Sequence, residues 1–197
     1  MSRRFRVSAL RKKVNLLGSF SILDLIVITL IASLGVAISG VIGNFVRIFT
    51  GPLFIPGGAV AGGIYMLFLV MPVALTGKKS AAVLAAVVQA IVVIVMPWAG
   101  SHGVATLITY TMPGVAIFIL LTVILRKHKG CCRLCCFFAC MVANLTGVAL
   151  VSGVVMNLPF VPMMLGLTVG ALSGGLGGLL TYQLAKKVKD LGVVFNE

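Results

Sequence analysis

The sequence predicts an all-α fold: a polytopic membrane protein built as a six-transmembrane-helix bundle with both termini in the cytoplasm. Hydrophobic residues make up 60% of the 197 residues and charged residues only 10%, whereas about 25% of a soluble domain is charged. The apolar residues form runs of about 20, the length that crosses a bilayer core. The basic residues fall into a few clusters between these runs. A soluble enzyme, a disordered chain and a secreted disulfide scaffold are excluded.

The chain begins with a basic segment, residues 1–20, which holds six of the sixteen basic residues. The apolar run over residues 22–43 is longer than the about 7–15 residues of a signal peptide, so we interpret it as a retained first span. Residues 44–56 contain a glycine and two prolines, which predict a loop or a short interfacial helix. We expect this segment to act as a lid over the outer face, although an interfacial helix resting on lipid is the competing interpretation.

Five further spans follow, separated by turns rich in glycine, proline or basic residues. They are predicted at residues 57–75, 81–96, 104–125, 134–156 and 163–184, with turns at 76–80, 97–103, 126–133 and 157–162. Pro113-Gly114 is expected to kink the fourth span. The predicted domain organisation is a cytoplasmic basic segment (1–20), a six-helix membrane domain (21–185) and a cytoplasmic tail (186–197).

The distribution of positive charge tests the number of spans. With six spans, fifteen of the sixteen lysines and arginines lie on one side, and Arg47 alone lies opposite. Because cytoplasmic loops carry the excess of lysine and arginine, this side is predicted to be the cytoplasm. The net charge of +13 therefore indicates topology rather than a nucleic-acid partner.

The predicted spans lack the residues that an ion-driven transporter or an enzyme needs. Asp24, near the cytoplasmic edge of the first span, is the only charged residue within them, and ion-driven transporters need buried ionisable groups at membrane depth. No P-loop, HExxH motif or catalytic triad is recognisable. We expect no enzyme activity, cofactor or metal. A solute transported uphill would need energy from another subunit, and a stand-alone small-solute channel or facilitator is the alternative.

Polar and aromatic residues gather towards the predicted outer face. Amides and hydroxyls there can orient a ligand, aromatic rings can stack on a flat ring, and a guanidinium can meet an anion. Trp98 and His102 are also the residue types that simply sit at a membrane interface. The candidate substrate-binding residues are Asn44, Arg47, Gln89, Trp98, Ser101, His102, Thr106, Tyr110 and Asn144.

Small residues recur at four-residue spacing in two spans, where they allow helices to approach closely. They are Thr29, Ser33 and Ala37 in the first span, and Gly170, Gly174 and Gly178 in the sixth. Packing inside the bundle is the simpler interpretation, and docking of a partner helix is the alternative.

Five cysteines cluster where the fifth span begins, at positions 131, 132, 135, 136 and 140. In a cytoplasmic location we expect reduced thiols. Their positions on a helix entering the bilayer suit small packing residues better than a metal site.

The segment from residue 57 to 118 resembles a known family. Its features are a glycine-rich second span, the basic turn Thr76-Gly77-Lys78-Lys79-Ser80, an alanine-rich third span, the break at 97–103 and Pro113-Gly114 in the fourth span. This order resembles the substrate-binding integral membrane subunits (S components) of energy-coupling factor (ECF) transporters, most closely the branch for thiamine and its hydroxymethylpyrimidine precursor. Residues 24–35 also resemble the opening helix of that family.

The resemblance implies a bundle, in the cell membrane of a prokaryote, that captures a vitamin or related micronutrient from outside. The cargo passes inward through an ATPase-driven module, whose partners are a transmembrane coupling subunit and two ATPase subunits. The family's docking positions correspond to Thr29, Ser33 and Ala37. Thiamine-type binders tend to carry a carboxylate, whereas here the third span has Gln89 and the outer half has no acid. We therefore expect a neutral or anionic ligand.

Overall fold

The protein is an all-helical bundle, as predicted. The computed structural model describes residues 20–51, 57–96, 103–125 and 132–191, except for the side chain of Arg47. Its main helices are α2 (Ile22–Thr50), α3 (Gly57–Thr76), α4 (Ala81–Val95), α5 (Ala105–Ile119), α6 (Arg133–Leu150) and α7 (Phe160–Asp190). Two π-helical segments, η3 (Leu120–Ile124) and η4 (Val151–Val155), extend α5 and α6.

Five of these helices, with η3 and η4 counted as parts of α5 and α6, are long and apolar enough to cross a membrane. The exception is α4, which has 15 residues and at 1.5 Å per residue spans about 22 Å. The order of helices therefore agrees with the predicted six, but the third is shorter than a bilayer core of about 30 Å.

Two helix boundaries differ from the predicted ones. The break predicted to begin at Asn44 starts later, because α2 continues to Thr50. The rings of Phe45 and Phe49 contact each other one turn apart, with centroids 5.4 Å apart, which favours the helix. The helix ends close to Pro52 instead, because the helical conformation is disfavoured for the residue that precedes a proline.

At the other boundary, α7 begins at Phe160 and includes the predicted turn residues 160–162. Pro162 is tolerated because the first turn of a helix needs no intrahelical N–H donor. The helix then continues to Asp190, so part of the predicted cytoplasmic tail is helical.

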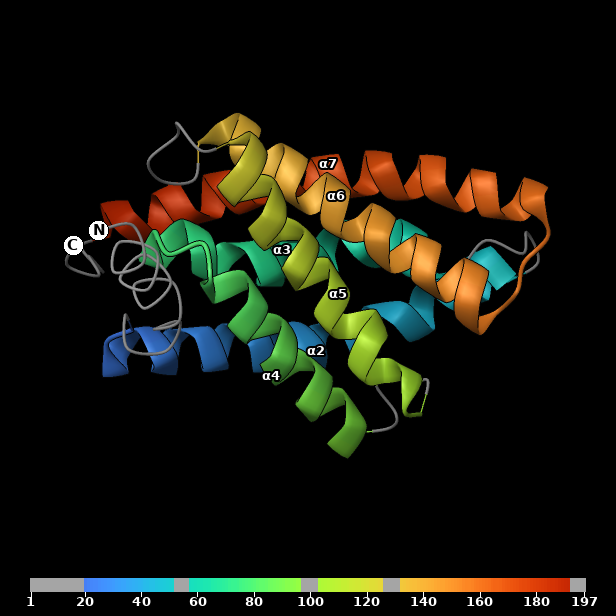
Figure 1. Ribbon diagram of the computed structural model, residues 1–197, viewed down its shortest axis with the longest axis horizontal. Helices are drawn as coiled ribbons and strands as arrows, with labels where there is room; N and C mark the ends of the chain where they lie inside the picture. The colour runs from blue at the N-terminus through green and yellow to red at the C-terminus, as the bar shows by residue number, and fades with distance from the viewer. Residues whose placement is uncertain (1–19, 52–56, 97–102, 126–131, 192–197) are drawn as a thin grey trace, which may run out of the picture.

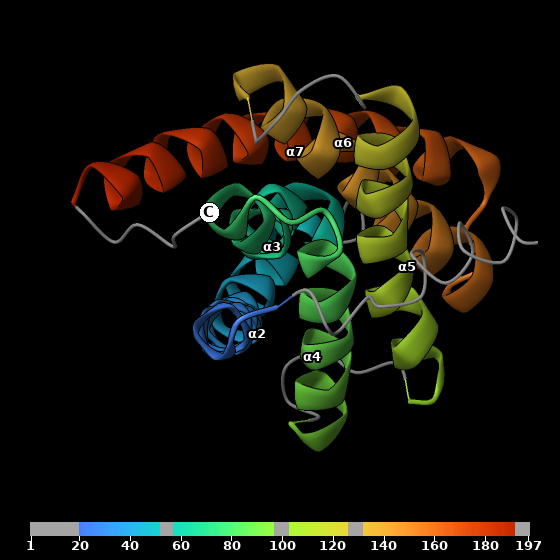
Figure 2. The ribbon, with the colours of Figure 1, turned by 60° about the vertical axis from the view of Figure 1, so that its left-hand side comes forward.

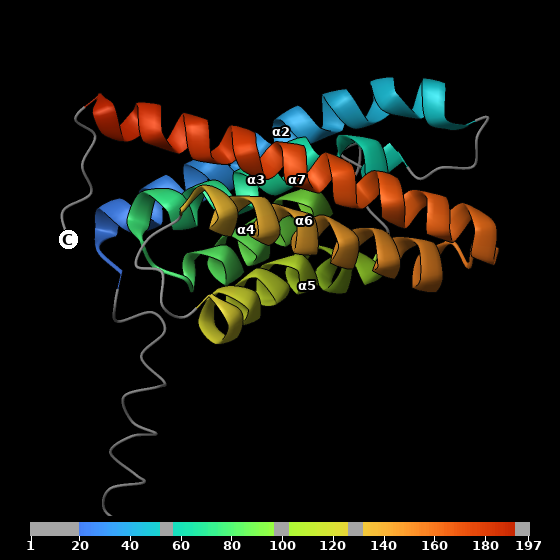
Figure 3. The ribbon, with the colours of Figure 1, turned by 90° about the horizontal axis from the view of Figure 1, so that it is seen from above.

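The helices are arranged around α3, which packs against α2, α4, α6 and α7 (Figure 1). Two further pairs lie side by side, α4 with α5 and α6 with α7, as Figures 2 and 3 show. The start of α2, the α3–α4 turn, the end of η3, the start of α6 and the end of α7 lie at the same end of the bundle, on the left of Figure 1. We call this the basic end, because it carries Lys78, Lys79, Arg133, Lys186, Lys187 and Lys189.

Small residues bring the helices close together. A Cβ atom on Gly174 or Gly178 would lie 2.8 or 2.4 Å from a carbonyl oxygen of α6. The glycine stripe of α7 therefore packs inside the bundle, in agreement with the simpler of the two interpretations. Five alanines of α4 are likewise fully buried: Ala81, Ala82, Ala85, Ala86 and Ala90.

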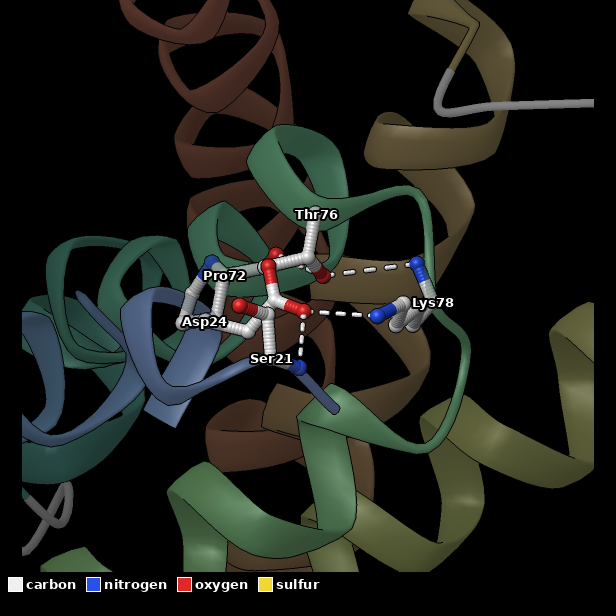
Figure 4. Close-up of polar contacts among 5 residues, drawn as sticks. All are labelled: Ser21, Asp24, Pro72, Thr76 and Lys78. Atoms are coloured by element: carbon white, nitrogen blue, oxygen red, sulfur yellow. Dashed lines mark hydrogen bonds and ion pairs between the residues drawn. The ribbon is translucent and has the colours of Figure 1, made fainter. Parts of the chain in front are cut away.

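The α3–α4 turn ties the basic end together. Gly77 closes α3 with a positive φ of 69° and donates its N–H to Val73 O, a common helix ending. Lys78 Nζ pairs with the buried Asp24 carboxylate at 2.6 Å, as Figure 4 shows. Lys79 Nζ donates to Leu121 O at 2.6 Å. The turn is thereby joined to both α2 and η3.

The cysteine cluster differs from expectation in its redox state. Cys132 caps α6, and its sulfur accepts the N–H of Cys135. This geometry places the two sulfur atoms together, and they form a disulfide. The expectation of reduced thiols is therefore wrong for this pair. Cys135, Cys136 and Cys140 are buried, in agreement with the predicted packing role.

Candidate ligand cavity

A cavity of about 160 Å³ lies between α2, α3, α4, α5 and α6, at the end of the bundle opposite the basic end. Its walls include the last turns of α2 and the first turn of α3, which are rich in glycine. The lining residues are Gly35, Val36, Ser39, Gly40, Gly43, Asn44, Gly57, Gly58, Ala59, Tyr65, Met66, Leu69, Gln89, Thr109, Tyr110, Pro113, Asn144, Gly147, Val148 and Val151.

Two carboxamides provide the strongest polar character of this cavity. Asn144 is 1% exposed and Gln89 is 8% exposed. Asn144 Nδ2 donates to Gly170 O at 2.8 Å and to Ala59 O at 3.4 Å, which fixes the orientation of the side chain. Its Oδ1 accepts no hydrogen bond from the residues that the structure describes. Gln89 likewise has no hydrogen-bond partner within the described ranges. Because buried polar groups are normally paired, these atoms are available for a ligand.

Two tyrosines border the same space. Tyr65 reaches from α3 across to α2, where its hydroxyl donates to Ser39 O at 3.1 Å. Gly43 makes room for this contact, since a Cβ atom there would lie 2.7 Å from the Tyr65 hydroxyl. Tyr110, from α5, is half-buried and packs against Val36 and Val93. The rings provide flat apolar surface beside the carboxamides.

The described lining of the cavity contains no charged side chain. Its members are glycine, alanine, aliphatic and neutral polar residues. A charged ligand held by these groups alone would lose its hydration without gaining a counter-charge, which is costly. The described walls therefore favour an uncharged molecule that forms hydrogen bonds.

The structure brings together four of the predicted binding residues. Asn44, Gln89, Tyr110 and Asn144 line the cavity. Thr106 is fully buried on α5 but is not among the lining residues. The remaining four predicted residues lie outside the described part of the chain. Trp98, Ser101 and His102 do so entirely, and Arg47 does so by its side chain. Those four stay predictions.

Sequence reasoning missed Ser39 and Tyr65. Ser39 lies four residues from both Gly35 and Gly43, and residues at this spacing share one helix face. This second small-residue face of the first span was the available signal. Tyr65 gave no comparable signal, because its role depends on how α3 lies against α2.

None of the three predicted docking residues on α2 lines the cavity. Thr29 and Ala37 are exposed, and Ser33 is half-buried. Thr29 Oγ1 donates only to Leu25 O of its own helix. Thr29 and Ala37 are therefore accessible on the surface of the bundle, and Ser33 is partly accessible.

Fold and cavity define the class of protein, a multi-pass membrane protein with an internal cavity whose described lining is uncharged. The model of the family described as "ABC-type cobalt transport system, permease component" matches residues 23–146, and the chain belongs to this family. Its structure is similar to a solved structure described as "Crystal structure of an S-component of ECF transporter". That match has a TM-score of 0.74 and 16% identity, and covers 89% of this chain and 88% of the other. No curated protein sequence matches the chain.

The structural match confirms the predicted resemblance to S components at the level of the fold. Family and fold together indicate a membrane subunit that binds a substrate for transport.

Proposed function

We propose that this protein is the substrate-binding subunit of an ECF-type importer and captures a small, uncharged, ring-bearing micronutrient from outside the cell. The observation that carries this proposal is the cavity of about 160 Å³ with two buried carboxamides that retain hydrogen-bonding capacity. ATP hydrolysis belongs to other subunits, because this sequence has no P-loop and no recognisable catalytic set. The protein itself is a non-enzymatic binding subunit.

The proposed orientation places the basic end, with both termini, in the cytoplasm of a prokaryotic cell. It follows from the positive-inside rule. Fifteen of the sixteen basic residues lie within residues 1–20, 76–80, 126–133 and 186–197, which in the sequence precede α2, connect α3 to α4, connect η3 to α6 and end the chain. The cavity is bordered by Gly43, Asn44 and Gly57, which lie at the opposite end of α2 and α3. In this orientation the cavity belongs to the outer half of the bundle.

The size and polarity of the cavity favour one kind of ligand. An apolar cavity of about 150 Å³ accommodates one benzene ring, so 160 Å³ suits a single six-membered ring better than a two-ring molecule. Gln89 and Asn144 offer both donors and acceptors to such a ring. We propose hydroxymethylpyrimidine, the neutral aminopyrimidine precursor of thiamine, in preference to thiamine, whose cationic ring has no counter-charge among the described lining residues.

Cobalt, which the family description names, is the competing cargo. A cobalt ion prefers imidazole, thiolate or carboxylate ligands. The described lining of the cavity contains no histidine, cysteine, aspartate or glutamate. The chemistry of this cavity therefore favours an organic molecule over a metal ion.

The proposed partners are a transmembrane coupling subunit and two ATPase subunits. We propose that Thr29, Ser33 and Ala37 form the docking stripe for the coupling subunit. Their support is that none of them lines the cavity, that Thr29 and Ala37 are exposed on the surface, and that small residues at this spacing let helices approach closely.

Two measurements test the proposal. Mass spectrometry of the tagged protein, purified gently from its native membrane, is expected to find a retained small molecule and co-purified ATPase subunits. Titration calorimetry is then expected to detect binding of hydroxymethylpyrimidine, and much weaker binding of thiamine and Co²⁺. Transport in liposomes by the chain alone, without ATPase subunits, would instead favour a channel or facilitator. Tight binding of Co²⁺ would overturn the proposed ligand.

A further inference from the structure

The first two turns of α3, residues 57–63, form a wall of the cavity. Gly57, Gly58 and Ala59 line it, and four of the seven residues in this segment are glycines. Glycine has a weak intrinsic preference for helix. The position of this wall therefore depends on contacts that neighbouring helices make with the backbone of residues 57–63.

Ser173 of α7 holds this wall from outside the cavity. Its hydroxyl donates to Val60 O at 2.6 Å and accepts the N–H of Gly63 at 2.9 Å. A single side chain thus uses both its donor and an acceptor position on the backbone of α3. The two backbones also lie close together, since a Cβ atom on Gly63 would be 2.0 Å from Ser173 O.

Asn144 holds the same segment from the cavity side. Its Nδ2 donates to Ala59 O, the carbonyl directly before the one that Ser173 binds. Two helices, α6 and α7, thereby fix consecutive carbonyls of α3. Ser173 is not a cavity-lining residue, so it has no direct access to a ligand there.

We infer that Ser173 is a positioning residue: it holds the α3 wall of the cavity in place, and through that wall it sets the affinity for the ligand. The inference about affinity rests on the proposed function, whereas the inference about the wall does not. A binding site that is held in its bound geometry does not have to be ordered when the ligand enters. Without the Ser173 hydroxyl, the α3 wall has to become ordered each time a ligand binds, and the free energy of that ordering lowers the affinity.

The size of the effect follows from the two hydrogen bonds. Two interhelical hydrogen bonds of average strength in a membrane protein correspond to about a five- to tenfold change in an equilibrium constant. We expect Ser173→Ala to weaken binding of hydroxymethylpyrimidine to the purified full-length protein by about this factor. Ser173→Thr keeps the hydroxyl and should restore binding to within about twofold.

Thr168→Ala is the matched control. Thr168 is exposed on the same helix, and its hydroxyl donates only to Leu165 O of α7. This variant also loses one hydroxyl from α7, but it loses no contact with α3. We expect it to bind hydroxymethylpyrimidine as the unmodified protein does. Equal losses in Ser173→Ala and Thr168→Ala would overturn the inference, because the effect would then not depend on α3.

Amide hydrogen exchange of the ligand-free protein tests the wall without any ligand. Ser173→Ala should accelerate exchange in a peptide covering residues 57–63, while Thr168→Ala and Ser173→Thr should leave it unchanged. Unchanged exchange in Ser173→Ala would overturn the inference, whatever the binding data show. Faster exchange with unaltered affinity would also overturn it. If the unmodified protein does not bind hydroxymethylpyrimidine at all, the proposed ligand fails, and exchange alone decides whether Ser173 holds the wall.

Discussion

Gly62→Ala should disable the cavity by displacing Asn144. A Cβ atom on Gly62 would lie 1.9 Å from Asn144 Oδ1, 2.4 Å from Cγ and 2.6 Å from Nδ2. Ordinary van der Waals contact begins at 3.4 Å, so the carboxamide has to move by about 1.5 Å, the difference between 3.4 and 1.9 Å. A shift of that size breaks the hydrogen bond of 2.8 Å from Nδ2 to Gly170 O.

The expected cost combines two effects. Overpacking a well-packed interior costs about 1–3 kcal/mol, and leaving a buried polar group without its partner costs about 1–3 kcal/mol more. We therefore expect Gly62→Ala to lose about 2–6 kcal/mol of stability. Because the carboxamide also leaves its place in the cavity, we expect affinity for hydroxymethylpyrimidine to fall at least tenfold.

Titration calorimetry and thermal unfolding in detergent measure these two losses. Gly153→Ala is the matched control, since a Cβ atom at Gly153 meets nothing within 4 Å and the residue does not line the cavity. If Gly62→Ala kept the affinity and the melting temperature of Gly153→Ala, the structural role assigned to Asn144 would be refuted.

Three further predictions concern other parts of the molecule. Gln89→Leu should weaken binding of hydroxymethylpyrimidine about tenfold without lowering the melting temperature. The melting temperature is kept because no described protein group loses a hydrogen-bond partner when the carboxamide is removed. A lower melting temperature with unchanged affinity would contradict this role. Lys78→Met should lower the melting temperature by leaving the buried Asp24 carboxylate unpaired, and adding Asp24→Asn should recover most of the loss; a double variant no more stable than Lys78→Met would contradict the pairing. Ser33→Leu should abolish co-purification of the ATPase subunits while calorimetric binding of hydroxymethylpyrimidine stays unchanged, and undiminished co-purification would exclude this stripe as the docking surface.

The helices were predictable from sequence because their signals are local. Runs of apolar residues and the breaks between them indicated the order of all six helices. The turn predicted at residues 76–80 agrees with the structure to within one residue, since α3 ends at Thr76 and α4 begins at Ala81. The predicted end of α2 was wrong because the break indicated by Gly51, Pro52 and Pro56 was extended back to Asn44. A single polar residue does not end a helix when apolar residues such as Phe45 and Phe49 follow and pack along it.

The cavity was only partly predictable, because cavities depend on contacts between distant segments. Gln89 and Asn144 were identifiable as polar residues in apolar spans. Nothing local to Tyr65 reveals that its hydroxyl reaches Ser39 O on another helix. The role inferred for Ser173 depends on two contacts more than 100 residues apart in sequence, and no pattern along the chain encodes them.

Helix α2 connects the two activities that we propose. Gly35, Ser39 and Gly43 line the cavity, whereas Ser33 belongs to the proposed docking stripe. Ser33 lies two residues before Gly35 and six before Ser39, so one stretch of α2 carries residues of both sets. A rigid displacement of α2 by a partner at the docking stripe therefore changes the wall of the cavity. Because coupling between two binding events is reciprocal, a ligand that fixes the position of α2 changes the affinity for that partner by the same factor. One helix that carries both sets of residues is sufficient for this linkage, without any charged relay through the core of the bundle.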